Sequence, residues 1–250
     1  MSTLIVDIWS DIVCPWCYLG KRRFESALDG FARRDAVQVR WRSFELDPHG
    51  SRRANLTLPE RHRRDVGGTP EQARRRIGAL SDLAAQSGLT YRLDLARPVN
   101  SFDAHRLMHY ADQVGVGERV RERLLLAYTG EGAVLSDHET LARLGAEAGL
   151  DPAATLAMLG SADFTESVRK DEALGRRLGV SGVPTFVFAE KYAVSGAQPV
   201  EVFADLLGPV MARDRPRRAP GRRRGLHGRR LLLRRRAALG WRRDLHGGTR

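Results

Sequence analysis

The sequence Cys14-Pro15-Trp16-Cys17 holds both cysteines of the 250-residue chain. An apolar run at residues 4–9 precedes this stretch, and a run with helical spacing of apolar residues follows it at 18–28. A strand, a short turn and a Cys-x-x-Cys pair that opens a helix are typical of a redox-active dithiol.

The two-residue spacing has a chemical reason. We expect Cys14 at the start of the helix, where unpaired backbone N–H groups and the positive end of the helix dipole favour thiolate over thiol. Pro15 fits the first helical position, because its missing N–H costs nothing there. Cys17 follows one turn later, close enough for a disulfide. The sequence predicts that Cys14 attacks a disulfide and that Cys17 resolves the mixed disulfide.

Two other uses of the cysteines are less well supported. A zinc site needs four ligands, and the chain has no second cysteine pair. His105 and His109 share one face of a predicted helix, but no Glu follows the first of them and no third ligand stands nearby in the sequence. We interpret them as histidines packed on a helix and expect no metal. A structural disulfide across two residues would be strained.

Composition limits the class of protein. Hydrophobic residues make up 42% of the chain, which is enough for a packed core. No apolar run approaches the ~20 residues that a membrane span needs, and residues 1–9 lack the pattern of a signal peptide. The expectation is a cytoplasmic protein without membrane contact, in which a lone cysteine pair is more often catalytic than structural.

The net charge of +12 is concentrated at one end. Residues 211–250 contain fifteen Arg and two Asp, whereas residues 1–210 contain 27 basic and 28 acidic residues. The body is thus close to neutral. It gives no sign of a nucleic-acid partner and favours substrates held in a hydrophobic groove over substrates steered by charge.

The predicted elements form an α/β pattern. Strands at 4–9 and 37–44 flank the first helix and make a βαβ unit. Helical spacing without strand signals covers residues 57–160. A helix at 164–178 then leads to a β-hairpin at 185–196 and a last helix from Pro199 to Leu207. Asp7 interrupts the first strand; it is either a buried carboxylate that relays protons beneath the dithiol or a strand-edge aspartate in water. Asp11 is a candidate cap for the first helix.

Three segments carry a resemblance to the thioredoxin superfamily, and within it to the cytoplasmic DsbA-like oxidoreductases of the FrnE type. These segments are Asp11-Ile12-Val13-Cys14-Pro15-Trp16-Cys17-Tyr18-Leu19-Gly20, Asn100-Ser101-Phe102-Asp103-Ala104-His105-Arg106-Leu107, and Gly179-Val180-Ser181-Gly182-Val183-Pro184-Thr185-Phe186 followed by Ser195-Gly196-Ala197-Gln198-Pro199. The resemblance covers about residues 3–207. It implies a thioredoxin fold (βαβ, then αββα) interrupted by an all-helical insertion. The corresponding domains are 1–56 and 161–208 for the two halves of the thioredoxin domain, 57–160 for the insertion, and 209–250 for an Arg-rich disordered tail.

The resemblance also implies a substrate-binding group, formed by Pro15, Trp16, Val183 and Pro184. In this superfamily the proline that precedes the third strand is cis and lies beside the dithiol. It leaves the backbone of Val183 free to pair with an extended substrate segment, while Trp16 and the insertion flank a groove. Without the resemblance, Pro184 could equally be a trans proline that opens a strand.

The function implied is that of a thiol–disulfide oxidoreductase, acting as reductase, oxidase or isomerase. It needs no cofactor beyond the redox-active disulfide Cys14–Cys17, with glutathione as a candidate small thiol. Its partners would be disulfide-containing proteins or small thiols. The alternative is a glutathione-dependent transferase or isomerase of small molecules. Relatives with that activity carry Ser where this chain has Cys14, so thiol exchange is favoured.

The tail departs from the family pattern. Its charge is consistent with nonspecific binding to nucleic acid through phosphate contacts, with a solvated segment that has no role, or with out-of-frame translation of a GC-rich gene. The shift from −1 in residues 1–210 to +13 in residues 211–250 favours the third interpretation. An insertion or deletion near codon 210 would confirm it.

Overall fold

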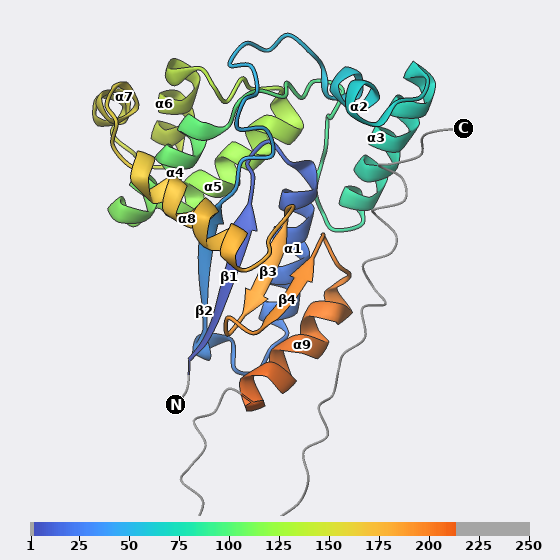
Figure 1. Cartoon of the computed structure of the whole chain (residues 1–250), viewed down its shortest axis with the longest axis vertical. Coiled ribbons are helices and arrows are strands. Elements are labelled where there is room, and N and C mark those ends of the chain that lie inside the picture. Colours follow the sequence, from blue (N-terminus) through green and yellow to red (C-terminus); the bar gives the residue numbers. More distant parts are fainter. Residues whose placement is uncertain (1–2, 214–250) are drawn as a thin grey trace, which may run out of the picture.

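A computed structural model describes residues 3–213 of the chain. A four-stranded sheet carries helices on both faces, and a helical domain inserted between its second and third strands lies at one end of it (Figure 1). The sheet part consists of β1 (Leu4–Ser10), α1 (Pro15–Asp29), a 3-10 turn (Arg34–Ala36), β2 (Val37–Ser43), α8 (Thr165–Arg177), β3 (Thr185–Phe188), β4 (Tyr192–Ser195) and α9 (Val200–Arg213). The inserted helices are α2 (Leu58–Val66), α3 (Pro70–Ala85), α4 (Phe102–Val114), α5 (Gly117–Leu126), a π turn (Ala127–Glu131), α6 (His138–Glu147) and α7 (Pro152–Gly160).

The strand order is β2-β1-β3-β4. β1 runs parallel to β2, with Leu4 opposite Val37, and antiparallel to β3, with Val6 opposite Phe188. β1 is therefore an interior strand covered on both faces, which explains its nearly continuous apolar sequence. The βαβ unit, the helical insertion and the later αββα unit agree with the fold class predicted from the sequence.

Each face of the sheet has its own core. Phe24 of α1, Phe186 of β3 and Phe203 of α9 pack together on one face, with ring centroids 4.6 Å apart for Phe186 and Phe203. On the other face, the Trp9 indole N–H donates to the Asp171 carbonyl oxygen of α8 at 2.9 Å. Gly175 of α8 lies so close to this ring that an added Cβ would be 2.6 Å from Trp9 Nε1. These contacts fix β1, and with it the loop that follows, between α1 and α8.

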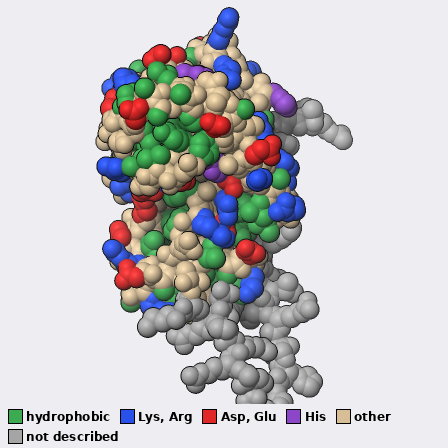
Figure 2. Space-filling view, turned by 90° about the vertical axis from the view of Figure 1, so that its left-hand side faces the viewer, with side chains coloured by type: hydrophobic (Ala, Val, Ile, Leu, Met, Phe, Trp, Pro, Cys, Tyr) green, Lys and Arg blue, Asp and Glu red, His purple; other side chains and the backbone are tan. Residues whose placement is uncertain are grey.

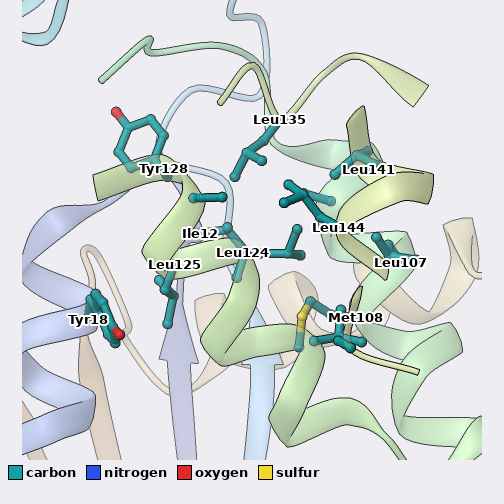
Figure 3. Packing of buried hydrophobic residues seen from close by; sticks show 14 of the residues in the cluster. Ile12, Tyr18, Leu107, Met108, Leu124, Leu125, Tyr128, Leu135, Leu141 and Leu144 are labelled. Carbon is teal, nitrogen blue, oxygen red and sulfur yellow. The ribbon is translucent and has the colours of Figure 1, made fainter. Parts of the chain in front are cut away.

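The helical domain packs directly against the loop and helix that carry the cysteines. On the face shown in Figure 2, acidic and basic side chains are interspersed around hydrophobic ones. Beneath the surface, Ile12 from the β1–α1 loop joins a buried cluster with leucines of α5, among them Leu124 and Leu125, and Tyr18 of α1 lies at its edge (Figure 3). The position of the dithiol thus depends on both parts of the chain.

A buried lysine joins the same two parts through charge. Lys21 of α1 is 3% exposed, and its ammonium lies 2.6–2.7 Å from Glu25, Glu118 and Glu122. Burial alone lowers the pKa of Lys21, but these carboxylates outweigh it and raise the pKa to about 12. The lysine therefore stays charged and links α1 to α5.

Helix starts follow the capping signals of the sequence. Thr69 caps α3 in a capping box with Gln72, and Thr57 with Glu60 does the same for α2. The predicted end of the last helix at Leu207 is wrong, because α9 continues to Arg213 with Pro209 inside it. Val210 and Met211 are buried in the same cluster as Leu4, and this packing outweighs the backbone hydrogen bond that Pro209 removes.

Most of the Arg-rich tail, residues 214–250, lies outside the described residues. The three interpretations of the tail therefore remain predictions. Within residues 3–213, no helix is both long enough and apolar enough to cross a membrane.

Candidate active site

The two cysteines lie at the start of α1, just after the loop that follows β1. Cys14 is the N-cap residue of α1, with φ −110° and ψ 107°, and Pro15 occupies the first helical position. The Cys17 N–H donates to the Cys14 carbonyl oxygen at 2.9 Å, within the first turn. Both residues are free thiols; 5% of Cys14 and 1% of Cys17 is exposed. Cys14 thus lies at the helix start, where the sequence placed it.

The two thiols differ in their surroundings. Burial, together with the hydrogen bond to Cys14 and its proximity, raises the pKa of Cys17 well above its usual value, although the Asp11 N–H at 3.4 Å from its sulfur acts in the opposite direction. Cys17 is thus held in the thiol form. The two sulfurs thus differ in position: Cys14 lies at the helix start, and Cys17 is the more deeply buried and keeps its proton.

The segment before β3 closes over the outer cysteine. The Val183–Pro184 peptide is cis, as the resemblance implied, and the Cys14 sulfur lies 3.9 Å from the Val183 carbonyl oxygen. The Pro184 ring rests on α1 at Gly20, where an added Cβ would lie 2.8 Å from Pro184 Cγ. Gly20 is therefore required for this close approach.

Aromatic side chains lie between the dithiol and the helical domain. Trp16 is half-buried and packs against both the helical core and the cluster that contains the cysteines. The Tyr91 hydroxyl donates to the Pro15 carbonyl oxygen at 2.7 Å, and its ring stacks on Tyr18. Tyr128 lies in the π turn with a buried hydroxyl that has no hydrogen-bond partner among residues 3–213. The structure therefore brings the four predicted substrate-binding residues, Pro15, Trp16, Val183 and Pro184, to the surroundings of Cys14.

Asp7 does not contact the dithiol. Its carboxylate is buried and accepts hydrogen bonds from Arg40 at 2.9 Å and Arg42 at 2.8 Å, both on β2. Among the described residues it has no contact with Cys14 or Cys17. The geometry thus gives no support to the proton relay that the sequence offered for Asp7. The alternative, a strand-edge aspartate in water, is wrong, because Asp7 lies in the interior strand and is 2% exposed.

A different aspartate lies beneath the dithiol. Asp11 is fully buried; its carboxylate accepts from the N–H groups of Val13 at 3.2 Å and Leu46 at 2.7 Å. His105 of α4 places Nε2 at 3.3 Å from Asp11 Oδ1. Burial lowers the pKa of His105, but Asp11, with Glu45 and Glu172 nearby, outweighs burial and raises it. This pair is the part of the site that the sequence interpretation missed: Asp11 was taken for a helix cap and His105 for a histidine packed on a helix.

The second histidine serves a separate cluster. His109 Nε2 lies 3.1 Å from Ser43 Oγ and 3.3 Å from Asp171 Oδ2. A serine nucleophile needs its base to be oriented by a carboxylate on the other ring nitrogen, and here both partners share Nε2. The cluster therefore lacks the geometry of a hydrolase. Within residues 3–213, no group of three or more His, Cys, Asp or Glu side chains is arranged to hold a metal ion.

Comparisons with known proteins agree with this geometry. The family model for the DSBA-like thioredoxin domain matches residues 5–208. The crystal structure of a probable DsbA oxidoreductase, SCO1869 from Streptomyces coelicolor, is 40% identical, with a TM-score of 0.82 and coverage of 85% of this chain and 92% of that one. The Bacillus subtilis protein YwbO is 26% identical over 203 residues, which is 80% of this chain and 94% of YwbO. The cytosolic disulfide reductase DsbM from Pseudomonas aeruginosa, solved with GSH, is similar in fold at 18% identity, with a TM-score of 0.57 and coverage of 84% and 99%.

Proposed function

Because the chain belongs to the family of DSBA-like thioredoxin domains, we propose that it is a thiol–disulfide oxidoreductase whose reacting atoms are the sulfurs of Cys14 and Cys17. One observation carries the proposal: Cys14 is the N-cap of α1 beside the cis Val183–Pro184 peptide, with Cys17 buried one turn further along. We expect the sulfur at the helix start to attack the substrate and the more deeply buried sulfur to resolve the mixed disulfide.

In the reducing direction the cycle has two exchanges. The Cys14 thiolate attacks one sulfur of a substrate disulfide, a mixed disulfide forms, and the other substrate sulfur leaves as a thiolate that takes up a proton. Cys17 then loses its proton and attacks Cys14 Sγ, which releases the second substrate thiol and leaves a Cys14–Cys17 disulfide. Two electrons pass from the dithiol to the substrate. An external thiol restores the dithiol by the same exchanges.

The protein's own groups act on these steps through position and charge. The helix start stabilises negative charge on Cys14 before attack. The Val183 N–H has no acceptor within residues 3–213, so it is available to an extended substrate segment beside the cis proline. The Asp11 N–H, at 3.4 Å from the Cys17 sulfur, stabilises the thiolate that Cys17 becomes in the resolving step.

The finer assignment is also a proposal. We place the protein among the FrnE-type branch, in the cytoplasm, with disulfide-containing proteins as substrates and glutathione as the thiol that resets the pair. The lone cysteine pair supports this location, and the fold shared with DsbM, a cytosolic disulfide reductase solved with GSH, supports the choice of thiol. The direction of exchange depends on the reduction potential of the pair.

The first experiment is the reduction of insulin by dithiothreitol, with wild type beside Cys14→Ser. The proposal expects acceleration by wild type and none by the variant. If neither accelerates the reaction, while both fold as judged by circular dichroism, the dithiol does not exchange with protein disulfides and the proposal is wrong.

A further inference from the structure

A strongly basic segment lies in the helical domain that packs against the dithiol helix. Residues 51–85, which comprise the loop before α2 together with α2 and α3, hold eight Arg and four acidic residues; we call this segment the basic hairpin. The rest of residues 1–210 holds 19 basic and 24 acidic residues. The near-neutral charge of the body thus conceals a positive segment on a negative remainder.

The fold presents these arginines to solvent. α3 buries Ala73, Leu80 and Ala84, which recur at helical spacing, so residues 74–76 between them point away from the core. α2 and α3 pack mainly against each other, across a turn at Gly67 and Gly68 with φ of +80° and +92°. The hairpin therefore projects from the helical domain (Figure 1).

Internal ion pairs leave part of the charge free. Asp65 pairs with Arg61 and Arg64, and Glu71 pairs with Arg74. The remaining exposed arginines include four with no carboxylate within ion-pair distance among residues 3–213: Arg53, Arg63, Arg75 and Arg76. The face in Figure 2, on the left of Figure 1 and away from the hairpin, carries both signs interspersed.

The hairpin is attached at the start of the dithiol helix. Leu80 and Ala84 of α3 belong to the same buried cluster as Ile12 and Tyr18, which flank the cysteines. Just after α3, Ser87 accepts a hydrogen bond from Arg23 of α1 at 3.4 Å. Tyr91 then reaches the Pro15 carbonyl oxygen at 2.7 Å. The C-terminal end of the hairpin is therefore anchored to the part of the fold that carries Cys14.

We propose that the basic hairpin is a docking surface for acidic polypeptide segments that flank the substrate disulfide. The inference rests on the proposed function and deepens it by naming the class of substrate. Free arginines on the domain that packs against the dithiol helix raise the rate of encounter with negatively charged chains and lower it for positive ones. A continuous phosphate backbone fits less well, because Glu60, Asp65 and Glu71 lie among the arginines.

The test uses the full chain and three synthetic peptides of equal length, each with one disulfide loop flanked by Asp and Glu, by Ser and Gln, or by Lys. Wild type is compared with Arg53→Glu/Arg63→Glu/Arg75→Glu. The matched control, Arg34→Glu/Arg119→Glu/Lys170→Glu, changes the net charge equally at exposed positions of other elements. The neutral hydroxyethyl disulfide reports the intact exchange chemistry.

We expect wild type to prefer the acidic peptide at ~20 mM salt and to lose the preference at ~0.5 M. The hairpin variant should lose about tenfold in kcat/KM for the acidic peptide, and about twofold or less for the neutral peptide and for hydroxyethyl disulfide. The control variant should keep the preference. A triple Arg→Gln version of the hairpin variant guards against a folding defect.

Other results would overturn the inference. The inference is wrong if the hairpin variant loses the same factor in kcat/KM with all three peptides. It is also wrong if that variant still prefers the acidic peptide, because the preference then comes from another part of the chain, such as the Arg-rich tail. If a single-stranded oligonucleotide binds wild type but not the hairpin variant, and no peptide is preferred, the arginines bind nucleic acid instead. If wild type turns over no disulfide, not even hydroxyethyl disulfide, the proposed function itself fails and the inference falls with it.

Discussion

His105 Nε2 lies 3.3 Å from Asp11 Oδ1, and the two side chains are 4% and 0% exposed. They come from α4 and from the loop before α1, so this ion pair joins the helical domain to the loop that carries the dithiol. The Asp11 backbone N–H also donates a hydrogen bond to the Cys17 sulfur. Asp11 therefore contacts both a buried histidine of the helical domain and the resolving cysteine.

Replacing His105 by Gln should destabilise the protein and change its pH dependence. The variant leaves the Asp11 carboxylate buried without a charged partner, so we expect a loss of about 3 kcal/mol in the free energy of unfolding at pH 6. Because the pKa of His105 is raised in the folded state, its contribution is complete below about pH 6.5 and is lost as pH rises through the folded-state pKa.

Urea unfolding between pH 6 and 8 checks this. Relative to His105→Gln, wild type should lose stability with rising pH in this window. His109→Gln is the matched control on the same helix, since His109 pairs with Asp171 away from the dithiol. Parallel profiles for wild type and His105→Gln would show that the Asp11–His105 pair is not charged in the folded state.

Replacing Cys17 by Ser should trap the first half of the reaction. The Cys14 thiolate still attacks, but without the resolving sulfur the mixed disulfide persists, and multiple turnover should fall by at least ~100-fold. Non-reducing gels and intact mass spectrometry should show a one-to-one adduct that dithiothreitol releases. Cys14→Ser should give no adduct. Nearly full activity of Cys17→Ser on a glutathione conjugate would favour the transferase or isomerase alternative.

Replacing Gly20 by Ala should disturb the site through Pro184. The added methyl would lie 2.8 Å from Pro184 Cγ, so the loop beside Cys14 must shift, and overpacking of this kind costs about 1–3 kcal/mol. We expect lower stability and a lower rate of insulin reduction. Gly78→Ala in α3 is the control, because an added Cβ there has no atom within 4 Å and should stabilise the helix by up to ~1 kcal/mol. Equal effects of the two variants would contradict the packing argument.

Replacing Asp7 by Asn separates a structural role from a proton relay. The change weakens two buried ion pairs with Arg40 and Arg42, so we expect a loss of about 1–3 kcal/mol in the free energy of unfolding. The pH profile of disulfide exchange should keep its shape, with rates within about twofold of wild type. A shifted profile in a folded variant would restore the proton relay.

The parts of the structure that local patterns govern were predictable from the sequence. The Cys-x-x-Cys pair, Pro15 at the first helical position and the apolar run of β1 each act within a few residues, and the fold follows from their order. The cis peptide at Pro184 came from the resemblance, not from any local pattern. The end of α9 was missed because Pro209 is a local stop signal, whereas the burial of Val210 and Met211 is a tertiary effect.

Contacts between distant segments explain the remaining differences. Asp11 and His105 are 94 residues apart, and nothing in either segment indicates that they meet. The partners of Asp7 lie on β2, where Arg40 is directly opposite it in the register, and this register is fixed only when the strands pair. For the basic hairpin, the charges were visible in the sequence, but their exposure on two helices that pack against each other needed the structure.

The strand order β2-β1-β3-β4 also bears on synthesis of the protein. Strand β1 ends at Ser10, but its neighbour β3 begins at Thr185 and leaves the ribosome only after the whole helical insertion. Until then, an apolar strand has one unpaired edge, which is a template for pairing with other chains. Nascent chains are thus exposed to aggregation during most of their translation, and chaperones that cover such an edge should raise the yield of folded protein.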